Sequence, residues 1–387
     1  MTSPYLSILL PTKNRSHLVD LAVRSVLQQD FDDYELIICD NDDDPAATRS
    51  ALQKHLDNPR VNYIRTGGIS MVDNWNRALK SARGKHITVL EDKMIFYPDS
   101  FRRLSSKIAQ SPTGVVVWEF DTIEDEHEPA RLKQIRSSED RVLNTDEVLD
   151  LVTSDIVGNW TILPRGLATS LPRTLVEAIV RESGKYFFEP LSPDFVSALK
   201  VLASIDSYLL TSDVYSLVTS NKVSNGRASL IRKTNNYMLG QDQMVINLDL
   251  VPVKSKLILA NVLVIDYRSQ AAAINGKLSD FPISHPNYLR MMTIDLLKST
   301  GQARRVVWNI GEIKELFLSE KKLLSNCLHI AKYSLKYLIH RLGTRIGAIR
   351  PQKGHISNDL DQDALCIADK FLSGDVSIGD KSPFRTQ

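Results

Sequence analysis

The sequence contains few cysteines and no long apolar run, and both shortages narrow the class of protein. The three cysteines, Cys39, Cys327 and Cys366, have no metal-ligand spacing, and an odd number does not form a complete disulfide framework. The longest largely apolar run, residues 257–265, is far shorter than the roughly 20 residues of a membrane-spanning helix. We therefore expect a protein of the reducing cytoplasm that has no membrane spans.

The chain also lacks an excess of charge of either sign and the common glycine-rich phosphate loops. Its 48 Lys and Arg against 46 Asp and Glu give a net charge of +2, which argues against a general nucleic-acid binder. No GxGxxG follows the first predicted strand, and no GxxxxGK[ST] occurs anywhere. The N-terminal stretch lacks the charged start and apolar segment of a signal peptide, so we expect none.

What the first hundred residues do contain is a regular alternation of apolar strands and amphipathic helices. Strands are predicted at 6–10, 35–39, 61–64 and 87–90, with helices at 16–29, 48–56 and 71–83 between them. This order predicts an α/β fold whose parallel sheet has helices on both faces. A chain of 387 residues, 43% of them hydrophobic, can bury such a core and carry an extension.

Polar residues collect where three of these strands end. They are residues 12–15 after the first strand, 40–44 after the second, and the adjacent carboxylates Glu91 and Asp92 after the fourth. Ligands of parallel sheets bind at this edge. Adjacent carboxylates repel each other unless a cation or hydroxyl donors lie opposite, so the pair indicates a binding site. An acidic surface loop is the alternative.

Four segments resemble the nucleotide-sugar half of family-two glycosyltransferases, which are inverting enzymes of the GT-A fold. They are LSILLPTKNR, YELIICDNDDD, DNWNRALKSARGKHITVLED and YPDSF, in the family's order and spacing. The resemblance implies a GT-A-type doubly wound, mostly parallel sheet with a mainly helical C-terminal extension. A nucleotidyltransferase on a similar sheet would be expected to have a glycine-rich loop after the first strand, and PTKNRS has no glycine.

The resemblance implies donor-binding roles at the strand ends. These fall on Pro11, Thr12, Asn14, Arg15, Asp40, Glu91, Asp92 and Lys93. Asp40 would accept from the imide N–H of uracil, with a turn-forming Asp as the alternative.

Glu91 and Asp92 stand in the place of the family's DXD motif. Glu91 would contact ribose, and Asp92 would bind Mg²⁺ or Mn²⁺, which offsets charge on the leaving diphosphate. A shift of this alignment by one residue is an alternative. Lys93 stands where many relatives carry an acid, and it would either weaken metal binding or share the metal's task.

A second half contributes the predicted catalytic base. Ser192-Pro193-Asp194 precedes an apolar helix and resembles an SPD motif in a subset of the family, in which the Asp deprotonates the acceptor hydroxyl. An Asp that only caps this helix is the alternative. Asn225 and Arg227 lie in a Ser-Asn-Gly-Arg turn that the resemblance places on the acceptor side, although a plain turn explains them equally well.

We predict a GT-A domain over 1–240, with a nucleotide-sugar half at 1–110 and an acceptor half at 111–240. A mainly helical region follows at 241–353, and then a polar tail at 354–387 for which disorder is an alternative. Leucines spaced by three and four, flanked by Lys and Arg, predict a basic amphipathic helix over 321–350. This helix could lie on the inner face of an anionic membrane, or it could pack on the domain or in a homodimer.

These expectations combine into one function. The chain is expected to move a sugar, with inversion, from a nucleoside-diphosphate donor, UDP-linked by preference, to a glycan or lipid-linked glycan of a bacterial surface polysaccharide. A non-catalytic nucleotide-sugar-binding or assembly protein of the same fold is the alternative, and Lys93 is its best support.

Overall fold

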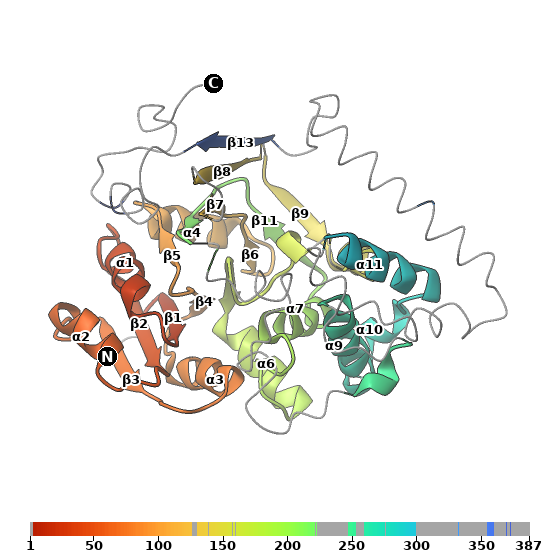
Figure 1. The fold of residues 1–387 in the computed structure, drawn as a ribbon, viewed down its shortest axis with the longest axis horizontal. Coiled ribbons are helices and arrows are strands. Elements are labelled where there is room, and N and C mark those ends of the chain that lie inside the picture. The colour runs from red at the N-terminus through yellow and green to blue at the C-terminus, as the bar shows by residue number, and fades with distance from the viewer. Residues whose placement is uncertain are drawn as a thin grey trace.

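The computed structural model describes residues 3–125, 130–137, 139–156, 158, 160–220, 222, 247–252, 259–274, 276–298, 332, 354–359, 369 and 372. An 8-stranded sheet forms the centre, in the order β3-β2-β1-β4-β10-β6-β11-β9 (Figure 1). Its strands are β1 (Leu6–Thr12), β2 (Tyr34–Asp40), β3 (Val61–Arg65), β4 (His86–Val89), β6 (Val116–Val117), β9 (Arg141–Asn144), β10 (Thr169–Pro172) and β11 (Ser207–Leu210).

The first four of these strands run parallel, as their apolar runs predict. Thr12 pairs with Asp40, and Leu9 pairs with Val89, so β1, β2 and β4 end at the same edge of the sheet. Beyond β4, β10 is antiparallel to both its neighbours, and β11 is parallel to β6. The sheet is therefore mixed but mostly parallel, which agrees with the predicted GT-A-type fold.

Helices cover both faces of this sheet. They are α1 (Ser16–Leu27), α2 (Ala47–Leu52), α3 (Met71–Ser81), α4 (Ser100–Gln110), α5 (Thr145–Ser154), α6 (Arg173–Ser183) and α7 (Pro193–Ser204). Successive side chains of a strand point to opposite faces. Accordingly, Ile8 and Leu10 pack with α1 and α4, whereas Leu9 packs in the core shared with α3, α5, α6 and α7.

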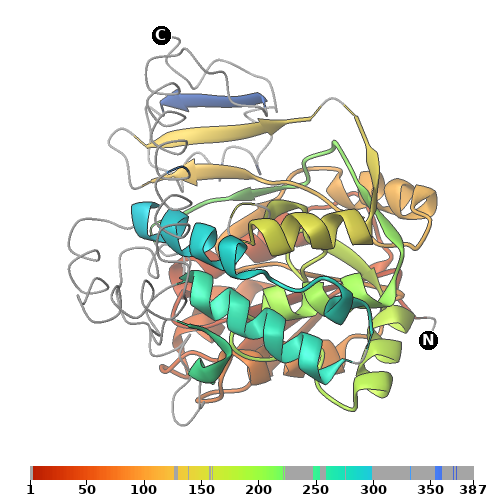
Figure 2. The same cartoon turned by 90° about the vertical axis from the view of Figure 1, so that its right-hand side faces the viewer.

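A smaller 5-stranded sheet lies beside the main one, in the order β13-β8-β7-β12-β5 (Figure 2). Its strands are β5 (Met94–Phe96), β7 (Asp121–Glu124), β8 (Arg131–Arg136), β12 (Ser216–Val218) and β13 (Gly354–Asp359). The many charged residues of 123–138 predict a loop, and that prediction is wrong, because β7 and β8 lie there. The charged residues alternate with Ile123 and Leu132, which are buried, so the pattern is that of a half-buried hairpin.

Three helices beyond residue 250 pack on the second half of the domain. They are α9 (Leu259–Ala273), α10 (Lys277–Asp280) and α11 (His285–Lys298), and they lie together beside α7 (Figure 1). The sequence from His285-Pro286 onward predicts a helix through about Leu297, and α11 confirms it. None of the helices in the described ranges is long and apolar enough to cross a membrane.

Two predictions concern segments that the structure describes only in part. Residues 354–359 form β13, which pairs antiparallel with β8, so the predicted polar tail begins with a strand. The basic helix predicted over 321–350 lies outside the described residues, apart from Lys332. The domain boundaries stay predictions.

The burial of two leucines predicts that their substitution by alanine will change the free energy of unfolding by different amounts. Leu9→Ala should lower the free energy of unfolding by about 2–5 kcal/mol, because Leu9 is fully buried and the cavity would be lined by packed side chains. Leu151→Ala is the matched control, since Leu151 on α5 is 46% exposed, and surface changes usually stay within about 0.5 kcal/mol. Urea unfolding midpoints measure both, and equal losses would contradict the layer assignment.

Candidate functional site

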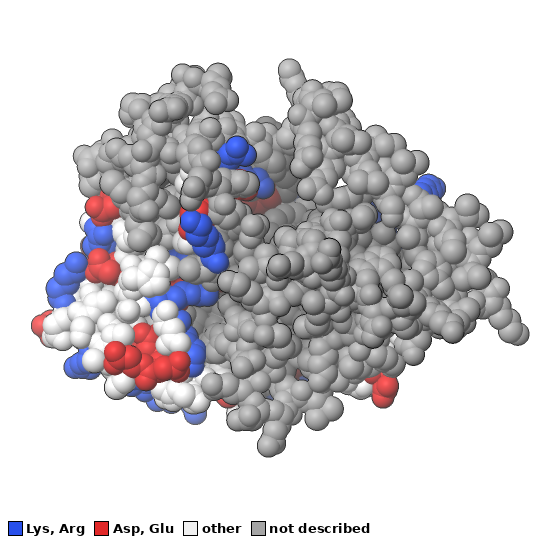
Figure 3. Space-filling model, viewed as in Figure 1, with Lys and Arg blue, Asp and Glu red and all other residues white. Residues whose placement is uncertain are grey.

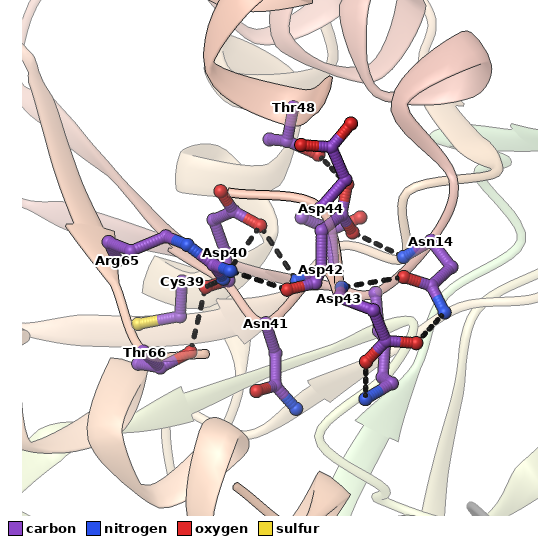
Figure 4. Close-up of polar contacts among 12 residues, drawn as sticks. Asn14, Cys39, Asp40, Asn41, Asp42, Asp43, Asp44, Thr48, Arg65 and Thr66 are labelled. Carbon is purple, nitrogen blue, oxygen red and sulfur yellow. Dashed lines mark hydrogen bonds and ion pairs between the residues drawn. The ribbon is translucent and has the colours of Figure 1, made fainter. Parts of the chain in front are cut away.

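The loop after β2 is held by its own carboxylates (Figure 4). Asp40 is fully buried, and its Oδ1 accepts the backbone N–H of Asp42 at 2.9 Å. Its Oδ2 accepts the Tyr63 hydroxyl at 2.5 Å, and the Arg65 guanidinium lies 3.5 Å from Oδ1. Burial and the Asp40 charge both raise the pKa of Tyr63, so the phenol stays a donor. Asp40 Oδ1 thus closes a turn in this loop, and the reading of a base by Asp40 stays a prediction.

The loops after β1 and β2 are joined to each other. Asp42 accepts the backbone N–H of Asn14 and the Thr48 hydroxyl, the latter at 2.6 Å. Asp43 accepts from Lys13 Nζ at 2.9 Å and from Asn14 Nδ2 at 2.7 Å. Asn14 has a φ of 56°, in the left-handed region that Asn tolerates, and this conformation aims its side chain at the second loop.

The Asp92 corner adds the end of β4 to these two loops. Asp92 Oδ2 accepts the Thr12 hydroxyl at 2.8 Å, and Oδ1 accepts from Arg15 Nη1 at 2.9 Å. Asp92 and Thr12 are buried, while Arg15 is part-exposed and Pro11 is buried within β1. The predicted donor-side residues of the first and fourth strands are therefore in direct contact.

Glu91 faces the second half of the domain. Lys93 Nζ lies 3.4 Å from Glu91 Oε2, and the Lys93 side chain is buried. A second cation, Arg165, also interacts with Glu91 through space. Both carboxylates of the predicted motif therefore have a basic partner, Arg15 for Asp92 and Lys93 for Glu91.

Arg165 links this corner to the predicted base. Its Nη1 lies 3.2 Å from Asp194 Oδ2, and its guanidinium carbon lies 4.5 Å from the centre of the Trp160 ring. Burial lowers the pKa of Arg165, while the charges of Asp194 and Glu91 act in the opposite direction. The buried Arg165 therefore pairs with Asp194, lies against an aromatic face and interacts electrostatically with Glu91.

Asp194 stands in the first turn of α7, directly after Pro193, where a helix tolerates proline. The N-cap residue Ser192 makes no side-chain cap hydrogen bond, and Ser197 Oγ donates to the backbone carbonyl of Asp194 at 2.8 Å. The Asp194 side chain is 30% exposed, and within the described part of the chain only its Oδ2 is engaged by a side chain. Oδ1 is thus available to a ligand.

A continuous line of contacts therefore runs from Asp42 through Asn14 to the β1 loop, and from Thr12 and Arg15 to Asp92. On the other side, Arg165 pairs with Asp194 and interacts electrostatically with Glu91. Arg165 and Tyr63 were missed by sequence reasoning, because no local motif marks a lone Arg after a loop or a Tyr within a strand. Asn225 and Arg227 lie outside the described residues.

The charges on the face of the molecule in Figure 3 agree with the composition. Over the region of α2 and β3, a group of acidic side chains lies beside several basic ones. This arrangement gives that region no broad basic surface of the kind that nucleic acids need.

A divalent metal would find oxygen ligands here, although the described residues contain no group of three or more His, Cys, Asp or Glu that could hold one alone. Mg²⁺ commonly binds through one or two carboxylates together with substrate phosphates and waters. Asp92 supplies hard oxygens, each with a lone pair beyond its present hydrogen bond. The donor set therefore fits an ion that binds together with a diphosphate.

Comparison with known proteins agrees with this geometry. Residues 7–169 match the sequence model described as glycosyl transferase family 2. Residues 7–169 are therefore similar to the domains of that family. The mostly parallel sheet with helices on both faces has the GT-A-type arrangement.

Two bacterial relatives are 36% identical to short stretches of the chain. One is from Escherichia coli and is named as the colanic acid biosynthesis glycosyl transferase WcaA, matching over 96 residues, 23% of this chain and 33% of that protein. The other is the GalNAc(5)-diNAcBac-PP-undecaprenol beta-1,3-glucosyltransferase of Campylobacter jejuni, matching over 93 residues, 23% of this chain and 29% of that protein. The chain thus spans about a third of the length of the curated relatives it matches.

Two matches among solved structures have low identities and TM-scores below 0.5. Staphylococcus aureus TarS 1-349 in complex with UDP-GlcNAc has a TM-score of 0.49 and 13% identity, over 86% of this chain and 92% of that one. The mannosyltransferase PcManGT of Pyrobaculum calidifontis, in complex with GDP-Man and Mn²⁺, has a TM-score of 0.45 and 15% identity, over 87% of this chain and 88% of that one.

The loop after β2 generates a prediction about stability. Asp40→Asn should lower the free energy of unfolding by about 1–3 kcal/mol, because the new amide group would face backbone, phenol or guanidinium donors. Tyr63→Phe is the matched control; it removes one donor and should cost about 0.5–1.5 kcal/mol. Thermal and urea unfolding measure both, and an Asn variant as stable as wild type would show that Asp40 is not a buried acceptor.

Proposed function

We propose that the chain is an inverting glycosyltransferase that moves a sugar from a nucleoside-diphosphate donor, UDP-linked by preference, to a hydroxyl of a glycan or lipid-linked glycan. The single observation that carries this proposal is the buried Arg165, which pairs with Asp194 and also interacts electrostatically with Glu91. It supports a site in which the predicted donor corner and the predicted base serve the same reacting atoms.

On the donor side, the part-exposed groups of the joined loops are suited to a nucleotide. Lys13, Asn14 and Arg15 supply N–H donors beside the carboxylates of Asp43 and Asp92. Arg15 and Lys93 are the cations nearest the Glu91–Asp92 corner, where the diphosphate would lie. For Asp40 to read uracil it would have to exchange one of its present donors for the imide N–H.

On the acceptor side, Asp194 is the proposed general base. The acceptor oxygen attacks the anomeric carbon as the bond to the leaving diphosphate oxygen breaks, and the hydroxyl proton passes to Asp194. One in-line displacement of this kind inverts the anomeric centre. Arg165 keeps Oδ2 engaged, so that Oδ1 is the oxygen presented to the acceptor.

The acceptor class is supported by two features. Trp160 is 40% exposed and lies against Arg165, so it offers an apolar ring beside Asp194 on which a sugar face could pack. The names of the two bacterial relatives concern colanic acid and an undecaprenol-linked glycan. We propose a cell-surface glycan acceptor and a cytoplasmic location, with residues 321–350 as a peripheral membrane or dimer contact.

A bound Mg²⁺ or Mn²⁺ would offset the charge that builds on the leaving diphosphate. Asp92 would hold it, with Glu91 close by. Because Arg15 and Lys93 already lie at these carboxylates, the chain's own cations would share that task. The pairing of Asp92 with Arg15 and of Glu91 with Lys93 also favours the second candidate function, a nucleotide-sugar-binding protein without transfer activity.

The base assignment predicts a selective loss. Asp194→Asn should bind UDP as wild type does but lose about 10²–10⁴-fold in turnover, since the acceptor proton no longer has a base. A donor panel run against mixed glycan acceptors and scored for released nucleoside diphosphate measures turnover, and calorimetry measures UDP binding. Glu177→Gln, an exposed change on α6, is the control. Undiminished turnover in the Asn variant would move the base elsewhere.

Metal removal gives an independent prediction. Excess EDTA should abolish most turnover and added Mn²⁺ should restore it, because a diphosphate leaving group needs more positive charge than Arg15 and Lys93 supply. Asp92→Asn should raise the Mn²⁺ concentration needed for half-maximal rate. Full turnover in EDTA would assign the electrostatic task to the chain's own cations.

A further inference from the structure

A buried carboxylate on α9 lies outside the side chains assigned so far. Asp266 is 2% exposed. Its Oδ1 accepts the backbone N–H of Leu191 at 2.8 Å, and its Oδ2 accepts that of Ser192 at 2.9 Å. These two residues directly precede Pro193 and Asp194. Helix α9 therefore binds, through two hydrogen bonds, the backbone that leads to the proposed base.

The same helix holds the segment at a second point. Gln270, one turn further along α9, donates from Nε2 to Glu189 Oε2 at 2.9 Å. Residues four apart lie on one helix face, so Asp266 and Gln270 act from the same side. Lys200 Nζ of α7 lies 3.3 Å from the same Glu189 oxygen, which ties the segment to α7 as well.

The first half of the domain anchors the other end of this segment. Asn76 on α3 donates from Nδ2 to the Phe188 carbonyl at 2.8 Å, and its Oδ1 accepts the Phe188 N–H at 3.3 Å. The backbone from Phe188 to Ser192 is thus fixed from α3 and from α9. Asp194 follows immediately, at the start of α7.

The α7 start depends on Asp266 for a physical reason. The first N–H groups of a helix need acceptors, yet Ser192 provides no side-chain cap and Pro193 has no N–H. Asp266 accepts the Ser192 N–H instead, and its position near this N-terminus suits a negative charge. Burial raises the pKa of Asp266 to about 7, while the two backbone N–H groups lower it and the Asp194 charge raises it.

We propose that Asp266 is a positioning residue for catalysis: by accepting both N–H groups it fixes the entry to α7, and so sets where Asp194 meets the acceptor hydroxyl. This inference rests on the proposed role of Asp194 as the base. It gives α9 a part in the reaction through the backbone that it holds.

Asp266→Asn tests the proposal, because the amide keeps one acceptor oxygen and turns an N–H₂ donor toward the other backbone N–H. We expect kcat to fall about 10–100-fold, as misplacement of a catalytic group by about 1 Å can cause, with UDP affinity and acceptor KM within about twofold of wild type. Asn261→Ala is the matched control. It removes a buried polar side chain of α9 that accepts the Tyr288 hydroxyl, and it should leave kcat within about twofold.

A double variant separates positioning from general destabilisation. In an Asp194→Asn background, Asp266→Asn should reduce the residual rate no further, because the two residues act as one unit. An additional loss of the same size as in wild type would overturn the proposal. If Asp266→Asn fails to fold, Gln270→Ala replaces it and should lower kcat several-fold in a folded protein; unchanged kcat there also overturns it.

The outcomes distinguish this inference from the function on which it rests. Full turnover in Asp194→Asn alone would refute the base assignment, whatever Asp266 does. An inactive Asp194→Asn together with a fully active Asp266→Asn would leave the base assignment standing and refute positioning by α9. Hydrogen exchange gives a readout without substrate: amides of residues 188–196 should exchange faster in Asp266→Asn and unchanged in Asn261→Ala.

Discussion

The contact on which the site depends is the buried guanidinium of Arg165. It lies 3.2 Å from Asp194, stacks on Trp160 and interacts with Glu91, so it neutralises carboxylates contributed by both halves of the domain. Without this cation, Asp194 Oδ2 would lose its ionic partner. The ion pair between Arg165 and Asp194 therefore helps to fix where the start of α7 lies.

The same principle organises the donor side. Asp92 is paired with Arg15, Glu91 with Lys93 and Asp43 with Lys13. Asp92 is the buried carboxylate of this set, and breaking a buried pair by removing one partner is costly, so Asp92 is held in place until a ligand supplies a better partner. A nucleotide and its metal could replace these pairs, because the diphosphate would pair with the cations and the metal would bind the carboxylates. Without a ligand, the carboxylates of the site are thus paired with the chain's own cations.

Much of the fold could be predicted from the sequence, because the strands of the parallel half are continuous apolar runs. Residues 6–10 and 35–39 fell within β1 and β2, and the SPD helix and the helix at His285 were also found. The hairpin of β7 and β8 was missed because its polar face is heavily charged. The strand β13 was missed because its partner is more than 200 residues away in the sequence, and no local pattern records such a pairing.

The site was predictable in its local parts and not in its tertiary ones. Asp92, Glu91 and Asp194 follow from motifs, whereas Arg165, Tyr63 and Asp266 act through contacts that only the folded chain creates. Asp266 lies in an apolar helix, 72 positions after Asp194 in the sequence (266 − 194), and nothing nearby marks it. Positioning groups of this kind become visible only when the backbone hydrogen bonds are accounted for.

The central claim is that one activated sugar lies between the joined β1 and β2 loops, the Glu91–Asp92 corner and Asp194. A crystal structure with a non-hydrolysable UDP-sugar and Mn²⁺ tests this directly. The account predicts the nucleotide against the β1 and β2 loops, the diphosphate at Asp92, and the anomeric carbon facing Asp194 with space for an acceptor hydroxyl between them. A nucleotide bound elsewhere, or an anomeric carbon turned away from Asp194, would contradict it.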